Sequence, residues 1–150
     1  MGLEIERKFL VNGNGWRRRV TGSAHIVQGY LARDRKSVIR VRIKDGKSAT
    51  LTIKSRDKGA RRAEFEYPIP LKDARDLLQL AGSSRIEKTR HTVPHGQLVW
   101  EIDVFEGRED KLILAEIELP NEDAAVKLPG WLGAEVTADP RYRNSSLAAP

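Results

Sequence analysis

Residues 39–54, IRVRIKDGKSATLTIK, contain two runs in which apolar and polar side chains alternate on either side of a short turn. This alternation places the apolar side chains on one face of a β-strand and the polar side chains on the other. Asp45-Gly46 lies between the runs and is typical of a tight hairpin turn, because glycine readily adopts the positive φ that this turn needs. The stretch therefore predicts an antiparallel hairpin with one charged face.

The same alternation recurs along most of the chain. Turn residues such as His95-Gly96 separate the alternating segments. We expect strands at about residues 3–11, 25–33, 37–44, 48–55, 61–69, 85–93, 97–105 and 111–119. Eight strands with so little intervening helix predict a mainly β protein of the α+β type.

Two helices are expected between the strands. Apolar residues recur at helical spacing over residues 71–81, and Gly82 follows as a C-cap. A second helix is expected to begin near Asn121, a good N-cap residue, and to end before Pro129.

The remaining segments are rich in turn residues. Residues 12–24 predict a loop with one helical turn around Trp16. In the tail from residue 138, Tyr142 and Leu147 are the residues suited to anchor the chain. No repeat or linker divides the sequence, so we expect a single domain over residues 1–150.

The composition limits the classes of function. Charged residues make up 32% of the 150 residues, against about 25% in typical domains. The chain has 27 Lys and Arg against 21 Asp and Glu, and this net charge of +6 favours an anionic partner. Cysteine is absent, which excludes disulfides and cysteine-ligated metals. Since no apolar run has the length of a signal peptide or a membrane span, we expect a soluble, cytoplasmic protein.

Six of the eight predicted strands carry two or more charges on one face. The cationic members are Lys8, Arg40, Arg42, Lys54, Lys88 and Arg90. The acidic members are Glu4, Glu6, Glu64, Glu66, Glu101, Asp103, Glu116 and Glu118. For any single strand, a solvated polar face is the more common explanation. Taken together, the repeated pairs of Arg, Glu and Asp favour a closed eight-stranded antiparallel β-barrel instead, with apolar faces packed outward against the helices and charges lining a lumen.

Charges this dense need partners inside a barrel, because each unpaired buried ion costs several kcal/mol. Carboxylates are hard oxygen donors that suit Mg²⁺ or Mn²⁺ better than zinc. The lysines and arginines suit phosphate, and arginine binds two oxygens at once. The two sets together favour a ligand with several phosphates bridged by metal.

The segment EIERKF, residues 4–9, resembles the signature of the CYTH superfamily, the triphosphate tunnel metalloenzymes. Further segments match in order over nearly the whole chain. These are QGY at 28–30, Arg40-x-Arg42, TIK ending at Lys54, EFE at 64–66, EKTR at 87–90, WEIDVF at 100–105 and AEIEL at 115–119.

The resemblance implies an eight-stranded tunnel that binds triphosphate, with divalent metal assisting hydrolysis or cyclisation. The implied metal ligands are Glu4, Glu6, Glu116 and Glu118, with Glu66 and Asp103 as further or water-mediated ligands. The implied phosphate ligands are Lys8, Arg40, Arg42, Lys54, Lys88 and Arg90. Tyr30 resembles a tyrosine that some short bacterial members place beside the motif lysine.

The short chain and the QGY segment are most similar to the bacterial inorganic tripolyphosphatases, which convert tripolyphosphate to pyrophosphate and phosphate. In such an enzyme Glu6 is a candidate to orient the attacking water. Two roles are open for Lys8: a base, if cationic neighbours keep its amine neutral, or a fixed charge on phosphate. Whether Arg141, Tyr142 or Arg143 closes one end of the tunnel is also open.

Two alternatives have other sequence features. A nucleotide or thiamine triphosphate substrate, including cyclisation of ATP, needs a stacking pocket, and Trp16 and Trp131 are candidates that fit a core or lid better. A polyphosphate- or RNA-binding module is suggested by the basic runs at 16–20 and 54–62. The low aromatic content of 6% and the paired carboxylates make nucleic acid an unfavoured partner. The three histidines show no metal-ligand spacing.

Overall fold

The computed structural model describes residues 2–55, 61–108 and 110–148. Its strands are β1 (Gly2–Val11), β2 (Gly22–Arg33), β3 (Ser37–Lys44), β4 (Ser48–Ser55), β5 (Arg61–Ile69), β6 (Arg85–His95), β7 (Leu98–Phe105), β8 (Ile113–Glu118) and β9 (Leu132–Glu135). Its helices are η1 (Gly15–Arg19), α1 (Leu71–Ala81), η2 (Pro140–Tyr142) and α2 (Asn144–Leu147). Among the described residues, no helix has the length and apolar character needed to cross a membrane.

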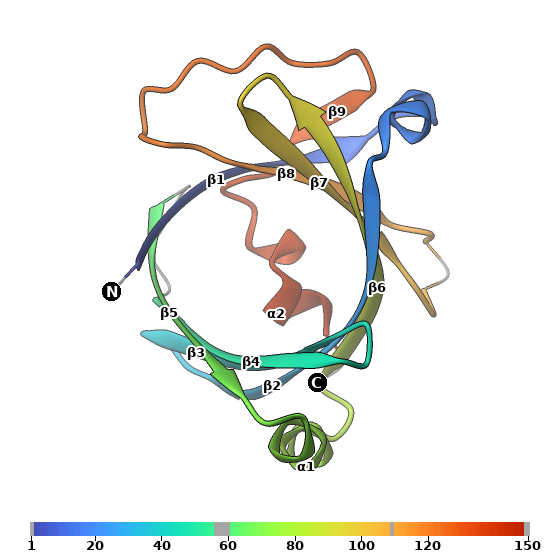
Figure 1. Ribbon diagram of the computed structural model, residues 1–150. Coiled ribbons are helices and arrows are strands. Elements are labelled where there is room, and N and C mark those ends of the chain that lie inside the picture. Colours follow the sequence, from blue (N-terminus) through green and yellow to red (C-terminus); the bar gives the residue numbers. More distant parts are fainter. Residues whose placement is uncertain (1, 56–60, 109, 149–150) are drawn as a thin grey trace.

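The first eight strands form a closed antiparallel barrel (Figure 1). The sheet runs in the order β5-β4-β3-β2-β6-β7-β8-β1-β9, and a further pairing between β5 and β1 closes it. Strand β1 makes this closure possible because residues 2–5 pair with β5 and residues 6–10 pair with β8. The predicted eight-stranded barrel is confirmed, whereas β9, which pairs with the end of β1, was not predicted.

The turn between β3 and β4 has the predicted geometry. Asp45 and Gly46 both have positive φ, of 54° and 63°, as a primed hairpin turn requires. The two strands pair in register from Lys44 and Ser48 outward. This register turns Arg40 and Arg42 to the same face of the sheet.

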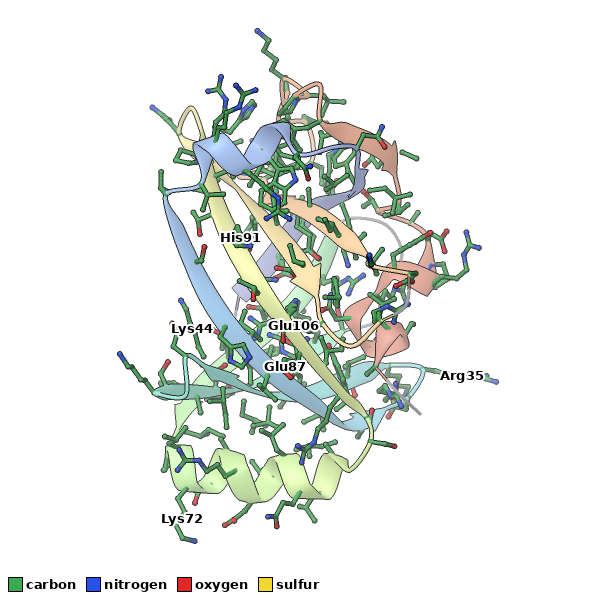
Figure 2. All side chains as sticks on the ribbon, turned by 90° about the vertical axis from the view of Figure 1, so that its right-hand side faces the viewer. Arg35, Lys44, Lys72, Glu87, His91 and Glu106 are labelled. Carbon is green, nitrogen blue, oxygen red and sulfur yellow. The ribbon has the colours of Figure 1, made fainter. Side chains whose placement is uncertain are left out.

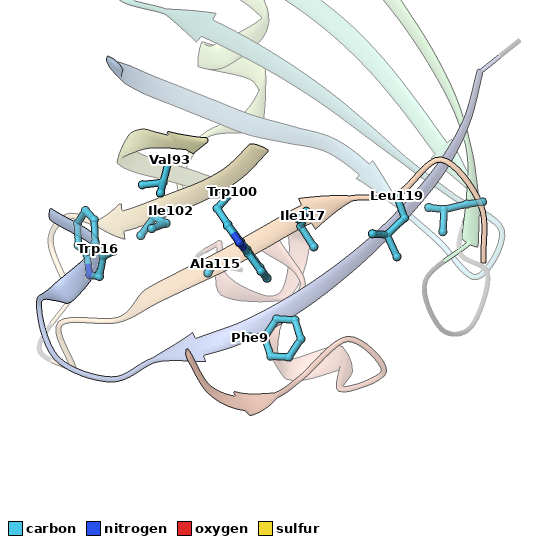
Figure 3. Close-up of a cluster of buried hydrophobic side chains, with 9 residues drawn as sticks. Phe9, Trp16, Val93, Trp100, Ile102, Ala115, Ile117 and Leu119 are labelled. Atoms are coloured by element: carbon cyan, nitrogen blue, oxygen red, sulfur yellow. The ribbon is translucent and has the colours of Figure 1, made fainter. Parts of the chain in front are cut away.

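The largest apolar cluster lies on the outer face of the barrel (Figure 3). It consists of Ile5, Phe9, Trp16, Val93, Trp100, Ile102, Ala115, Ile117 and Leu119. The ring of Trp100 lies edge-on to Phe9 at 5.7 Å and to Trp131 at 5.6 Å between centroids. Trp16 and Trp131 therefore belong to the packing outside the lumen, as the interpretation as core or lid residues requires.

Helix α1 covers another part of the outer face. Its buried residues Ala74 and Leu78 pack in one cluster with Val41, Ile43 and Ala49 of β3 and β4. The predicted bounds of this helix are confirmed.

The second predicted helix, from Asn121 toward Pro129, is absent. Asn121 instead begins a single turn, in which its side chain accepts a hydrogen bond from the backbone N–H of Asp123 at 3.0 Å. The chain then runs extended, so that Ala124 and Val126 both pack on the outer core cluster while Ala125 is exposed. This alternation of burial has the two-residue period of an extended chain. The predicted helix rested on Asn121 as an N-cap residue, and that residue type is equally common at the start of a turn.

Helix α2 lies inside the barrel, which corrects the expectation that all helices pack outside (Figure 1). A second apolar cluster surrounds it and includes Tyr30, Ile86, Phe105, Leu114 and Ala148. The tail residues Tyr142 and Leu147 pack against this cluster, which confirms them as its anchors. Apolar residues at this end of the lumen make a helix inside the barrel favourable, because both surfaces leave water.

Candidate functional site

The lumen contains a polar cavity of about 210 Å³. The described residues that line it are Glu4, Glu6, Lys8, Tyr30, Val38, Arg40, Arg42, Lys54, Arg62, Glu64, Glu66, Arg90, Glu101, Glu116, Glu118, Arg143, Asn144 and Ser145. All predicted site residues lie on this surface except Lys88 and Asp103. The inward face of the barrel therefore brings together residues that are far apart in the sequence.

Strands β1 and β8 supply an acidic wall. Their register places Glu6 directly opposite Glu118, and Lys8 opposite Glu116. Burial, together with the negative charge of Glu116, raises the pKa of Glu6 to about 8. Burial and the charge of Glu4 also raise the pKa of Glu118. The wall thus holds carboxylates that repel one another.

Lys54 joins this wall to β5. Its Nζ lies 2.9 Å from Glu4 Oε1 and 3.4 Å from Glu64 Oε2. Burial and a hydrogen bond with Glu4 raise the pKa of Glu64 to about 7. For Glu4, burial is outweighed by the hydrogen bond from Glu64 and the charge of Lys54, so its pKa is lowered.

A cationic wall faces the acidic one. Arg40 donates from Nη2 to Thr52 Oγ1 at 3.2 Å, while its buried Nε has no hydrogen-bond partner among the described residues. Arg62 lies instead beside the acidic wall, on β5 directly opposite Glu4, and its Nε is likewise buried with no hydrogen-bond partner among the described residues. Burial, with the charges of Arg40 and Arg90, lowers the pKa of Arg42 to about 9. These arginines have donors available for an anion in the lumen.

Glu66 lies beside these cations rather than on the acidic wall. Its Oε2 accepts a hydrogen bond from Thr52 at 3.1 Å and lies 3.9 Å from Arg40 Nη2. Glu101 is placed similarly, with its Oε2 3.3 Å from Arg90 Nη1.

Lys88 and Asp103 lie behind the cavity surface and are almost fully buried. Asp103 Oδ2 accepts hydrogen bonds from Lys88 Nζ at 2.6 Å and Arg90 Nη2 at 2.9 Å, and its Oδ1 accepts one from Arg90 Nε at 2.8 Å. The charges of Lys88 and Arg90 outweigh burial and lower the pKa of Asp103. Since both oxygens are occupied by cations, this carboxylate orients Arg90 toward the cavity.

Lys8 has neighbours other than the expected cations. Its Nζ lies 3.0 Å from Glu116 Oε1 and donates to the carbonyl oxygen of Tyr142 at 2.9 Å. The charges of Lys8, Arg90 and Lys88 overcome burial and hold the pKa of Glu116 well below its usual value. Both contacts place hydrogen-bond acceptors, not cations, around Nζ.

The segment Gln28-Gly29-Tyr30 connects the site to the fold. The Gln28 side chain accepts from Arg42 Nε at 2.8 Å and donates to Tyr30 Oη at 3.0 Å and Asn144 Oδ1 at 3.3 Å. Gly29 faces α1 on the other side of β2, where a Cβ atom would lie 2.7 Å from Ala81 Cβ. On one face of β2 this segment therefore turns Gln28 and Tyr30 toward the lumen, and on the other face Gly29 leaves room for α1 to pack.

Several lining residues were not among the predicted site residues. The alternation placed Glu64 and Glu101 on the charged face without assigning them a role in the site, and Arg62, which was missed, continues the same two-residue spacing along β5. The tail residues Arg143, Asn144 and Ser145 were not accessible in this way. Asn144 Oδ1 accepts from Lys88 Nζ at 2.8 Å, a contact that exists only because α2 enters the barrel.

A second cavity of about 570 Å³ continues the first. The two share Arg42, Glu66, Arg90 and Glu101. The other residues lining the second cavity are Gly22, Ser23, Ala24, Ile26, Lys44, Asp45, Ser48, Ala49, Thr50 and Thr92. None of these described residues is aromatic, so this mouth of the lumen has no stacking surface.

A family model, the CYTH domain, matches residues 2–147. The chain belongs to the CYTH family. This confirms the resemblance that begins with Glu4, Glu6 and Lys8, which all reach the lumen.

Curated CYTH relatives cover almost the whole chain. A protein from Acetivibrio thermocellus named inorganic triphosphatase is 43% identical over 148 residues, which are 98% of this chain and 94% of the relative. One of the same name from Nitrosomonas europaea is 40% identical over 153 residues, with 97% and 96% covered.

Solved structures agree with the CYTH fold. The crystal structure of the inorganic triphosphatase NE1496 is 35% identical, with a TM-score of 0.68 and coverage of 99% of this chain and 95% of that chain. The PH1012 protein from Pyrococcus horikoshii has a TM-score of 0.65 at 19% identity over 80% of each chain, a likeness of fold alone.

The CYTH lumen has a donor set that fits a hard divalent cation. Apart from Glu66, five of the lining carboxylates form the acidic wall of β1, β5 and β8, and burial raises the pKa values of Glu6, Glu64 and Glu118. The five are Glu4, Glu6, Glu64, Glu116 and Glu118. Oxygen-only donors of this kind suit Mg²⁺ or Mn²⁺.

Proposed function

We propose that this protein hydrolyses inorganic tripolyphosphate to pyrophosphate and phosphate, with help from Mg²⁺ or Mn²⁺. The observation that carries the proposal is a polar cavity inside the closed barrel, with carboxylates concentrated on one side and arginines on the other. A polyanion bridged by divalent cations is the ligand that satisfies both walls. The names of the two curated relatives support the same activity.

The cations of the lumen bind the phosphate chain. Arg40, Arg42, Arg62 and Arg90 present guanidinium groups to the cavity, and Arg143 reaches it from the tail. Guanidinium groups bind two phosphate oxygens at once, so they fix both the position and the rotation of the substrate. Lys54 lines the cavity between Glu4 and Glu64, whereas Lys88, which is engaged with Asp103, acts from behind the cavity surface.

The carboxylates of β1, β5 and β8 hold the metal ion. Glu4, Glu6, Glu116 and Glu118 are the predicted ligands, and Glu64 joins them because it lines the same wall. When bound, a divalent cation neutralises the charge that develops on the phosphate oxygens. Glu66 and Glu101 lie beside arginines, so they balance the cationic wall.

In the reaction, a water oxygen forms a bond to the terminal phosphorus while the bond from that phosphorus to the bridging oxygen breaks. Glu6, once ionised, accepts a hydrogen bond from the water and orients it. Lys8 stays charged between Glu116 and the Tyr142 carbonyl and offsets charge on the substrate. Tyr30 accepts the hydrogen bond of Gln28, so its own hydroxyl hydrogen is donated to a phosphate oxygen.

An inorganic substrate fits better than an organic triphosphate. Trp16 and Trp131 pack in the outer core, and the described lining of the second cavity contains no aromatic side chain. A nucleobase or thiamine ring would find polar and small side chains at this mouth, with no surface on which to stack.

Phosphate release from tripolyphosphate, ATP and thiamine triphosphate, each with Mg²⁺, tests the proposal. We expect turnover of tripolyphosphate to exceed that of the other two by more than about tenfold, which corresponds to roughly 1.4 kcal/mol. Glu6→Gln should lose the metal-dependent turnover, whereas Asp73→Asn on the exposed start of α1 should keep it. Faster turnover of an organic triphosphate would refute the substrate.

The alternative function as a polyphosphate- or RNA-binding module is tested by the same assay together with a measurement of RNA binding. Absence of metal-dependent phosphate release, together with RNA binding that weakens steeply with salt, would replace the enzyme by a nucleic-acid binder. Of the basic runs that suggested this alternative, residues 56–60 lie outside the described part of the chain.

A further inference from the structure

The outer face of the wall formed by β2, β6 and β7 carries metal-ligating side chains that the lumen does not use. His25 lies on β2, Glu87 lies on β6, and Glu106 directly follows β7. One ligand atom from each of the three lies within 4.8 Å of the other two. Figure 2 shows Glu87 and Glu106 close together on the barrel face turned to the viewer, with His91 farther along β6.

The strand register explains why these side chains meet. Lys88 and Arg90 point inward, so Glu87 and the residues at the same alternation on β6 point outward. His25 is the β2 residue opposite Thr89. The backbone N–H of Glu106 donates to the carbonyl oxygen of Glu87 at 3.0 Å, so both glutamates start from neighbouring, hydrogen-bonded backbone positions.

Two like charges meet on this face. Glu87 lies on β6 and Glu106 directly follows β7, and like-charged neighbours across strands destabilise a sheet. Within the described part of the chain, the ion pair of Glu87 is with His25 at 2.6 Å, and no lysine or arginine forms an ion pair with Glu106. The Thr89 hydroxyl donates to Glu106 Oε1 at 3.3 Å, which orients this carboxylate without neutralising it.

We propose that His25, Glu87 and Glu106 bind a divalent transition-metal cation, with Zn²⁺ as the first candidate. An imidazole nitrogen is a donor that zinc and cobalt prefer and magnesium does not, which separates this site from the all-oxygen set in the lumen. Two ligand atoms of one zinc ion lie roughly 3.4 Å apart. The three ligand atoms lie at most 4.8 Å apart, and rotation of their exposed side chains brings them to the separation that one zinc ion requires.

The site has the parts that a zinc site of three protein ligands needs. The backbone N–H of His25 donates to Asp45 Oδ1 at 2.8 Å, so the position of the residue is fixed while its ring can turn. The side chains of His25 and Glu87 are 45% and 51% exposed, which leaves room for a water molecule as fourth ligand. The bound ion links β2, β6 and β7 from outside, on the opposite side of the wall from Lys88 and Arg90.

Nuclear magnetic resonance of the imidazole rings tests the site directly, because the chain has only three histidines. One equivalent of ZnCl₂ added to metal-free protein should shift the ring nitrogen resonances of His25 and leave those of His91 and His95 in place. A large excess of MgCl₂ should not reproduce the shift. Zinc that enters the lumen does not mimic this signal, since it lies on the other face of the sheet.

Variants separate a three-ligand site from zinc bound by a lone histidine. Glu106→Gln and Glu87→Gln should each weaken the zinc affinity at His25 by more than about 100-fold, beyond the effect of losing an outer hydrogen-bond partner. His91→Ala is the matched control on the same strand, and its protein should bind with unchanged affinity. The proposal is overturned if the His25 resonances do not respond to equimolar zinc, or if Glu106→Gln binds zinc as tightly as the wild type.

Discussion

Binding of Mg²⁺ in the lumen is expected to release protons at pH 7. The metal-free site holds protons because burial raises the pKa of Glu6 to about 8 and that of Glu64 to about 7. With a pKa near 8, about 90% of Glu6 side chains are protonated at pH 7 and about half at pH 8. Since a carboxylate must be ionised to hold a metal, each binding event displaces these protons.

Titration calorimetry in buffers of different ionisation enthalpy measures the effect. At pH 7 the observed enthalpy of Mg²⁺ binding should change with the buffer ionisation enthalpy with a slope of about one proton from Glu6, plus a contribution from Glu64. At pH 8 the contribution of Glu6 should fall to about half a proton. From Glu6 alone the dissociation constant should decrease by about tenfold between pH 6 and pH 7, Glu64 should add a further factor of up to about five, and the decrease should slow above pH 8.

The variant Glu6→Gln removes the main source of these protons. It should bind Mg²⁺ more weakly and lose most of the proton release, while Asp73→Asn, which removes an exposed carboxylate of α1, should behave as the wild type. Enthalpies that do not depend on the buffer at pH 7 would refute the reasoning. Equal proton release from Glu6→Gln would refute the assignment to Glu6.

Metal-free Glu6→Gln should gain stability relative to the wild type from pH 5 to pH 8 in thermal unfolding. The folded-state pKa of Glu6 lies above its usual value of 4.5, so ionisation destabilises the fold over this range, by roughly 3 kcal/mol at pH 7; parallel pH profiles would contradict this. Gly29→Ala should lower the free energy of unfolding in urea by about 1–3 kcal/mol, because its Cβ would meet Ala81 at 2.7 Å. Gly22→Ala on the same strand has nothing within 4 Å and should cost much less; equal losses would exclude the packing explanation. Lys8→Ala should lower kcat/KM roughly 10- to 150-fold, as expected for loss of a charged contact. Lys8→Arg should keep most of the turnover, and a comparable loss in Lys8→Arg would favour proton transfer instead.

The lumen surface was largely predictable because it depends on local spacing. A two-residue alternation assigns each side chain of a strand to one face without knowledge of the partner strand. Closing the barrel then sends the charged face inward for every strand at once, which is why residues as distant as Glu4 and Glu118 could be placed in one site from the sequence.

The partners of these charges were not predictable, because they depend on register between strands distant in the sequence. Lys54 was expected on phosphate, yet the pairing of β4, β5 and β1 brings its Nζ between Glu4 and Glu64. Asp103 was expected near metal, yet β6 and β7 place it against Lys88 and Arg90. A shift of two residues in either register would keep every charge inward and exchange these partners.

The position of the tail, residues 140–148, was also not predictable from the sequence, and it affects the surroundings of Lys8. No periodicity marks residues 140–148, and their position is set by the apolar ring at one end of the lumen, which exists only once the barrel has closed. Inside it, the carbonyl oxygen of Tyr142 accepts a hydrogen bond from Lys8 Nζ, and Asn144 Oδ1 accepts one from Lys88 Nζ. Nζ of Lys8 thus lies between a carboxylate and a carbonyl oxygen, and an ammonium donates to both while its charge offsets that of Glu116. The tail therefore supports the fixed-charge role proposed for Lys8, although no periodicity in the sequence marks this part of the chain.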